Sequence, residues 1–333
     1  MRSIHRRTPA ALGLALLLTA CQPGEQSREA GYEQVSRAFV SEVVLPNYRQ
    51  LVTGSQQLSA ALDALAATPG KAPLEAAREA WRQVRSTWET SESWAFGPAE
   101  TGGYDGNLDD WPVNEKDLGA ALASGAMTPE LFAKLTTTAK GFHAIEAVLY
   151  GTDGRRPADS QLSGAELAFL RQAGADLALK AQGLLNAWEG SQGFGANFTV
   201  NAEEAVAEIV QGMVGTLEEV AAEKLRAPLA SRKAGDLESF YSDNTRADIV
   251  ANLAGVQEAL QRSGLLELIE RRDAQLASSL KQTLAEAQSS ARDLPAQLNK
   301  ALDDPAGRHK IQAVIQVSDR SAALLKKAAA LLA

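Results

Sequence analysis

The chain has 333 residues and a formal net charge of -8, and hydrophobic residues make up 45% of it but aromatic residues only 5%. Residues 1–20 hold three arginines and no acidic residue, so their removal changes the net charge to -11 and leaves no basic patch for nucleic acid. The hydrophobic residues are largely Ala and Leu, which are the strongest helix formers. The composition therefore favours an all-α fold and argues against a nucleic-acid partner.

The N-terminus has the pattern of a signal peptide over residues 1–20. Three arginines precede an apolar run that is too short to span a bilayer as a stable anchor. The run ends in Leu18-Thr19-Ala20-Cys21, which resembles a bacterial lipobox, and Cys21 is the only cysteine. We therefore expect a lipid on Cys21 and a periplasm-facing lipoprotein, and Gln22 favours the outer membrane. The alternative is an ordinary signal peptide followed by an unmodified cysteine.

Helical periodicity dominates the rest of the chain. Residues 21–31 are polar and predict a flexible tether, and Pro46 should kink or break the first helix. Residues 99–114 read as a long irregular loop, of the kind that is often functional. The Gly-rich segment 189–195 predicts a boundary between lobes 32–190 and 191–333, two helical bundles with a cleft at their interface. The predicted helices cover residues 32–65, 73–94, 129–150, 164–188, 201–226 (ending before Pro228), 265–293 and 305–333.

The most informative motif lies in the helix predicted over residues 129–150. His143 and Glu146 are three residues apart and share a helix face, as a metal-ligand pair or an acid/base pair would. A structural ion pair is the common alternative. Gly141 in mid-helix would cost about 1 kcal/mol relative to Ala, which suggests that another backbone or a ligand approaches there.

Acidic residues before this helix extend the candidate site. Glu89 and Glu92 share a face, and two like charges so placed repel unless a cation or a base lies between them. Asp109 and Trp111 follow in the predicted loop. With His143, the carboxylates of Glu89, Glu92 and Asp109 would form an oxygen-rich ligand set that suits iron or manganese, while zinc stays possible. A solvated acidic face is the alternative. The tryptophans of residues 73–94 are assigned to the core.

A polar cluster in the second lobe begins at Glu238 and Ser239 and reaches Ser242. Its simplest interpretation is a helix cap at Ser242 or Asp243, which leaves Glu238 and Ser239 unexplained. The sequence holds no second histidine in a familiar zinc-peptidase motif, no serine-nucleophile motif and no nucleotide-binding loop.

Several spaced motifs together resemble the imelysin-like family of bacterial periplasmic and outer-membrane lipoproteins. Their order spans nearly the whole chain after residue 20. The motifs are Gly-x-His-x-x-Glu at Gly141, His143 and Glu146; Trp88-Glu89 with Glu92 and Phe96-Gly97-Pro98; Asp109 with Trp111-Pro112; the run from Glu223 to Leu229; and Glu238-Ser239 with Ser242-Asp243.

The resemblance implies two helical lobes with the His143 helix facing their interface, and a link to iron uptake or regulation. It implies a metal site formed by His143, Glu146, Glu89, Glu92 and Asp109, with a cleft lined by Gly141, Trp111, Glu238, Ser239 and Ser242. Envelope iron-transport proteins are possible partners, and iron or an iron chelate is the expected ligand. One alternative is a metallopeptidase with Glu146 as the general base. Another is an interaction protein of the cell envelope that holds no metal.

Overall fold

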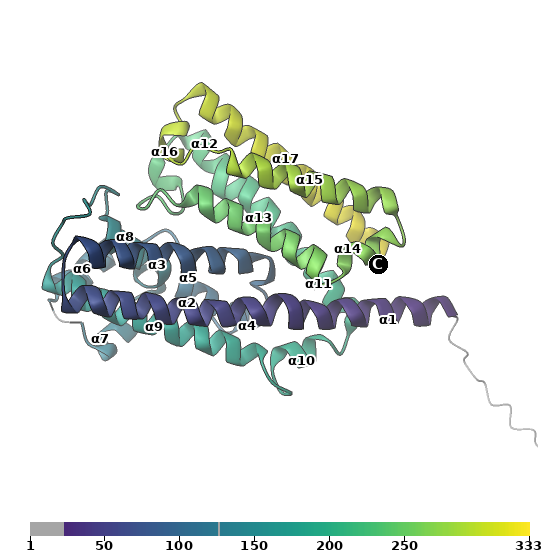
Figure 1. Ribbon diagram of the computed structural model, residues 1–333, viewed down its shortest axis with the longest axis horizontal. Helices are drawn as coiled ribbons and strands as arrows, with labels where there is room; N and C mark the ends of the chain where they lie inside the picture. Colours follow the sequence, from purple (N-terminus) through teal and green to yellow (C-terminus); the bar gives the residue numbers. More distant parts are fainter. Residues whose placement is uncertain (1–22, 126) are drawn as a thin grey trace, which may run out of the picture.

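The computed structural model describes residues 23–125 and 127–333, and over these residues its regular elements are all helical (Figure 1). The predicted all-α fold is thereby confirmed. The predicted signal peptide and Cys21 lie outside the described residues. None of the described helices combines the length and the apolar character needed to cross a membrane.

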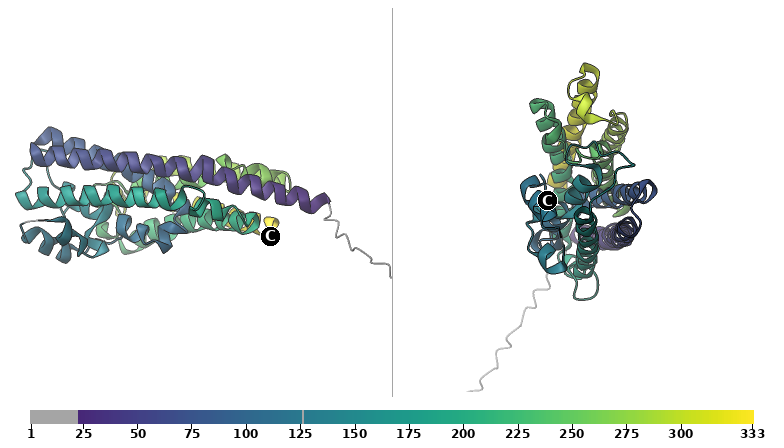
Figure 2. Two further views of the ribbon diagram at one scale, coloured as in Figure 1. Left: turned by 90° about the horizontal axis from the view of Figure 1, so that it is seen from below. Right: turned by 90° about the vertical axis from the view of Figure 1, so that its left-hand side faces the viewer.

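Two bundles make up the molecule, and the long helices of the first run nearly side by side (Figure 2). The helix α2 (Leu45–Ala67) packs against α3 (Lys71–Thr90) on one side and α9 (Gly164–Trp188) on the other. Two short helices lie within residues 98–109 of the stretch predicted as an irregular loop, whereas residues 110–114 are irregular as expected. The remaining elements are η2 (Ser91–Trp94), α4 (Pro98–Thr101), α5 (Tyr104–Asp109), α6 (Glu115–Ala123), α7 (Pro129–Ala133), η3 (Thr137–Ala139), α8 (Gly141–Tyr150) and α10 (Phe194–Phe198).

The second bundle is formed by the C-terminal part of the chain. Within it α17 packs against α11 and α15, while α13 packs against α3 of the first bundle. The two bundles thus meet along α3 and α13. The elements are α11 (Ala202–Glu219), η4 (Val220–Arg226), α12 (Ala227–Ser231), η5 (Ala234–Asp236), α13 (Thr245–Arg262), α14 (Leu265–Glu270), α15 (Ala274–Arg292), α16 (Leu298–Ala301) and α17 (Pro305–Leu332).

Two prolines that were expected to interrupt helices are accommodated by wide π-helical turns. The turn η1 (Phe39–Val44) precedes Pro46, and η4 precedes Pro228. Proline lacks the backbone N–H of a regular helix, and a local change of register compensates for the missing hydrogen bond. The helix is therefore not broken at Pro46, one of the two outcomes expected there, and the stop expected before Pro228 is wrong: both helices continue, and η4 carries Lys224.

The first helix belongs in space to the second bundle. The structure has α1 (Pro23–Ala38) helical from Pro23, so the predicted tether is helical over residues 23–31. Its C-terminal part packs against α11, and the Tyr32 hydroxyl donates a hydrogen bond to the carbonyl of Leu332. The N-terminal helix and the last turn of the chain are thereby joined, across the boundary expected at residues 189–195.

The core confirms that the tryptophans are structural. Trp81, Trp88 and Trp94 are fully buried, and each large ring removes apolar surface from water. The Trp81 indole N–H also donates to the carbonyl of Phe142, at 2.9 Å. This bond ties α3 to the start of α8, the helix of the Gly-x-His-x-x-Glu motif.

Candidate functional site

Gly141 begins α8, and the helix predicted over residues 129–150 is three separate pieces. The φ angle of Gly141 is +67°, a left-handed conformation that favours glycine. A Cβ at this position would lie 2.2 Å from the carbonyl oxygen of Leu108 in α5. The mid-helix placement was wrong, but the predicted close backbone approach is confirmed. Because Gly141 lets α5 approach so closely, Asp109 at the end of α5 reaches His143.

His143 is buried, and its two ring nitrogens face different partners. The Nδ1 atom lies 3.2 Å from Oε2 of Glu146 and forms a hydrogen bond with it. The Nε2 atom lies 3.1 Å from Oδ1 of Asp109 and 3.6 Å from Oε1 of Glu238, without hydrogen-bond geometry. Burial and the charge of Arg85 lower the pKa of His143, but the neighbouring carboxylates of Glu146 and Glu238 outweigh them and raise it above its usual value.

Glu146 connects the two lobes. Its Oε1 accepts hydrogen bonds from the backbone N–H of Ser242 at 2.8 Å and from the Ser242 hydroxyl at 2.6 Å. The expected helix cap at Ser242 or Asp243 is not formed: Asn244 precedes α13, and Asp243 has a left-handed φ of +58°. With one oxygen on His143 and the other on Ser242, Glu146 has no oxygen directed at a water in the cavity described below. This geometry does not favour the general-base role.

Arg85 was missed by the sequence analysis and stands at the centre of the site. Its fully buried guanidinium forms ion pairs with Glu89 and Asp109 and, at 2.8 Å, with Glu238. The Oδ1 atom of Asp248 lies 3.8 Å from Nε of Arg85. A signal was present: Arg85 precedes Glu89 by four residues on one helix, the spacing of an ion pair. Arg85 is one of the cations that offset the repulsion expected between Glu89 and Glu92 of this segment.

Lys224 is the second buried cation and was also given no role. Its Nζ lies 2.8 Å from Glu89 and 2.8 Å from Glu238. Burial lowers the pKa of Lys224, but the carboxylates of Glu238 and Glu89 raise it well above its usual value. Burial raises the pKa of Glu238, but Lys224 and His143 lower it well below the usual range. Lys224 and Glu238 are therefore both ionised at neutral pH.

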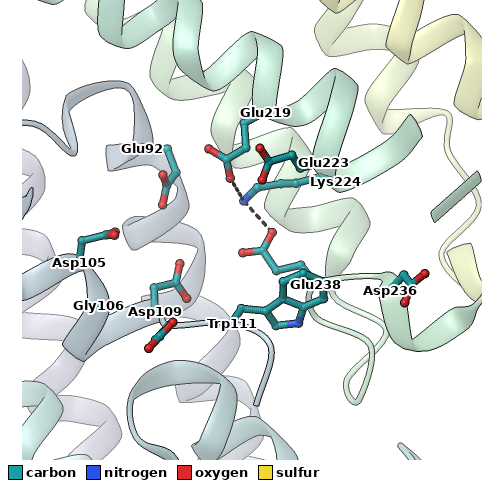
Figure 3. A pocket seen from close by; sticks show the side chains of 11 residues that line it. Glu92, Asp105, Gly106, Asp109, Trp111, Glu219, Glu223, Lys224, Asp236 and Glu238 are labelled. Atoms are coloured by element: carbon teal, nitrogen blue, oxygen red, sulfur yellow. Dashed lines mark ion pairs between the residues drawn. The ribbon is translucent and has the colours of Figure 1, made fainter. Parts of the chain in front are cut away.

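Arg85, Lys224 and His143, together with the carboxylates of Glu89, Asp109 and Glu238, form a buried ion network. This ion network forms one wall of an acidic cavity of about 280 Å³ between the lobes. Figure 3 shows side chains from both lobes pointing toward one another around Lys224. Trp111, which follows α5, lines the cavity and is 38% exposed. The lining residues are Glu92, Asp105, Gly106, Asp109, Asp110, Trp111, Glu219, Glu223, Lys224, Asp236 and Glu238.

Three lining carboxyl groups resist ionisation. Burial raises the pKa of Glu92 well above its usual value, and the charge of Glu219 adds to this. Burial likewise raises the pKa of Asp105, aided by Asp110, and that of Glu219. A cation in the cavity would relieve this repulsion and release the protons.

The structure thus divides the predicted site into two parts. Glu92, Asp109, Trp111 and Glu238 line the cavity, whereas Glu89 and His143 lie behind it in the ion network. Among the described residues, potential ligand atoms lie within 4.8 Å of one another in two groups: Asp109, His143 and Glu238, and Glu89, Glu92 and Asp109. Glu146 is in neither group. Ser239 donates to Asp248 instead of lining the cavity, and Gly141 packs against α5.

The architecture is that of a two-lobed helical protein with a buried ion network and an acidic cavity where the lobes meet. The chain belongs to the imelysin family: the family's sequence profile (Peptidase M75) matches residues 44–325. It is 36% identical over 236 residues to the "Iron-regulated protein A" of Synechococcus elongatus, covering 67% of this chain and 63% of that protein. The chain thus spans under two thirds of that relative's length.

Two solved structures share the fold. A protein described as an iron-regulated protein A precursor, from Parabacteroides distasonis, superposes with a TM-score of 0.84 at 22% identity, covering 92% of this chain and 96% of that one. An imelysin-like protein from Psychrobacter arcticum has a TM-score of 0.77 at 18% identity, with coverage of 90% and 94%. These identities support the likeness of the fold alone.

The raised pKa values predict that the metal-free protein loses stability as pH rises. The pKa of Asp248 is raised by burial to about 7, and those of Glu92, Asp105 and Glu219 are raised too. From about pH 4 to 7 the folded chain therefore holds more protons than the unfolded chain, whose carboxyl groups titrate near 4. We expect urea denaturation in EDTA to give a smaller unfolding free energy at pH 7 than at pH 5.

The variant Asp248→Asn isolates one of these groups. The asparagine side chain cannot ionise, so the decline in unfolding free energy between pH 5 and 7 should become shallower. Glu238 acts in the opposite direction only below its usual pKa, outside this range. A wild-type protein whose unfolding free energy increases from pH 5 to pH 7 would contradict the assignment of raised pKa values.

Proposed function

We propose that this protein binds iron, as an ion or in an iron-bearing ligand, in the acidic cavity between its lobes, and that it acts in iron uptake or regulation. The relatives that carry the name iron-regulated protein A support the link to iron. The charge of the cavity supports the class of ligand. Carboxylate oxygens are hard donors of the kind that bind iron and other oxygen-seeking metals.

The observation that carries this proposal is the charge balance of the lining. Eight acidic side chains face the cavity against a single lysine. Such a surface attracts cations and repels an anionic chelate. The volume of about 280 Å³ also exceeds that of a bare ion, since a water occupies about 30 Å³ in the liquid. A hydrated iron ion or a cationic complex therefore suits the cavity better than an anionic chelate does.

Anaerobic calorimetric titration of the metal-free protein with Fe²⁺ tests the proposal. We expect one saturable site, weakened by about tenfold or more in Glu92→Gln and in Asp105→Asn, since even indirect partners of a metal contribute 10–100-fold. The control is Glu286→Gln, which removes an exposed carboxylate that is paired with Arg320 and is not part of the cavity lining. Absence of iron binding by folded protein, or equal affinity in all variants, would exclude this site.

We further propose that the chain is held at the periplasmic face of the outer membrane by a lipid on Cys21, where envelope iron-transport proteins would be its partners. The lipobox-like sequence Leu18-Thr19-Ala20-Cys21 supports the anchor. The full chain should fractionate with membranes after expression in a bacterium, and Cys21→Ser should leave it in the soluble fraction. Equal membrane association of the two forms would contradict the anchor.

A further inference from the structure

We propose that the guanidinium of Arg85 takes the place of a metal ion in the His143 centre, so that the Gly-x-His-x-x-Glu motif of this chain forms a metal-independent clamp between the lobes. The resemblance to the family led us to expect His143 and Glu146 as metal ligands. The residues around His143 do not fit a metal. This inference is independent of whether the cavity in front of the centre binds iron.

The ligand atoms that a metal would need are already engaged. The oxygens that face Nε2 of His143 are Oδ1 of Asp109 and Oε1 of Glu238. The same two oxygens accept from Nη1 and Nη2 of Arg85. A metal bound by His143 and these oxygens would share them with a fixed positive charge, which opposes its binding.

The second oxygens of the two carboxylates are engaged as well. Oδ2 of Asp109 accepts from the Trp88 indole N–H at 2.6 Å, and Oε2 of Glu238 lies 2.8 Å from Nζ of Lys224. Neither carboxylate can turn toward a metal without losing a buried partner. A planar guanidinium contacts two carboxylates through parallel N–H groups, so it can bridge Asp109 and Glu238 as a metal would.

Arg85 is also held where it is. Its side chain is fully buried, and its guanidinium carbon lies 5.5 Å from the centre of the Phe142 ring. The partners come from both lobes: Asp109 from α5, and Glu238 from the segment that also brings Ser242 to Glu146. The centre therefore joins the lobes through ion pairs and hydrogen bonds that need no metal.

Removal of the guanidinium should turn the centre into a metal site. We expect Arg85→Met, which keeps the stem that packs on Phe142, to gain one Zn²⁺ site per chain in calorimetric titration. The extra site should disappear in Arg85→Met/His143→Ala. In the wild-type background His143→Ala should change Zn²⁺ affinity by less than about twofold, even if the acidic cavity binds Zn²⁺.

Chemical rescue gives a second measurement. Millimolar guanidinium or Zn²⁺ should raise the melting temperature of Arg85→Met more than that of Arg82→Met, which loses a partly exposed arginine from the same helix. The inference is overturned if His143→Ala weakens Zn²⁺ binding by tenfold in the wild-type background. It is equally overturned if folded Arg85→Met gains no site, or if neither cation restores an unfolded variant. A wild-type protein that binds no iron would contradict only the proposed function.

Discussion

The substitution Gly141→Ala should lower the free energy of unfolding by about 3 kcal/mol or more. A non-glycine residue with left-handed φ costs about 1–3 kcal/mol by itself, and Gly141 has a φ of +67°. The new Cβ would also lie 2.2 Å from the Leu108 carbonyl oxygen, so the backbone of α5 would have to move. Urea denaturation followed by circular dichroism measures the loss.

The matched control is Gly119→Ala. Gly119 lies exposed within α6, its φ is not positive, and an added Cβ would contact nothing within 4 Å. Because Ala is a better helix former than Gly, this variant should gain about 0.5–1 kcal/mol. If the two variants had equal stability, Gly141 would not be the residue that lets α5 approach α8. Displacement of α5 would also move Asp109 away from His143.

The case of Gly141 shows how far the sequence could lead. An interior glycine predicted a close approach, because its cost needed a reason, and the approach is there. The apolar positions from Leu131 to Leu149 keep a helical period, so they gave no sign that residues 134–140 leave the helix. Residues 134–140 leave the helix because of contacts with residues 110–114: the Thr137 hydroxyl donates to Asp110, and the Asn114 N–H donates to the Thr138 carbonyl at 3.0 Å.

Periodicity and composition were sufficient for the all-α fold, since helices bury their apolar stripes locally. The candidate site was predicted less completely, because the search looked for ligands of a metal and therefore for acids and histidine. Acids such as Glu89, Asp109 and Glu238 were found, but the other acids of the cavity lining and the resident cations were not. Lys224 lies 135 residues from Glu89 and Arg85 lies 153 residues from Glu238, so no local spacing links those partners.

The substitution Lys224→Met should be about as damaging as Gly141→Ala, with an expected cost of about 3–5 kcal/mol in unfolding free energy. Met keeps most of the volume, but Glu89 and Glu238 each lose a partner 2.8 Å away in a buried place. Removal of one member of a buried ion pair leaves an uncompensated charge, which costs about this much. The control Lys326→Met breaks an exposed pair with Glu218 and should cost less than about 1 kcal/mol.

A double-mutant cycle separates the ion pair from general packing. Glu89→Gln in the Lys224→Met background removes one stranded charge, so the double variant should be more stable than the sum of the single losses implies, by about 0.5–3 kcal/mol. Recovery should be partial, because Glu89 also pairs with Arg85 and accepts from Asn252 at 2.7 Å. Since Lys224 lies in η4 and Glu89 in α3, this coupling energy measures an interaction between the lobes. A coupling of zero would mean that the two side chains stabilise the protein separately, and that the ion pair of Lys224 and Glu89 does not hold the lobes together.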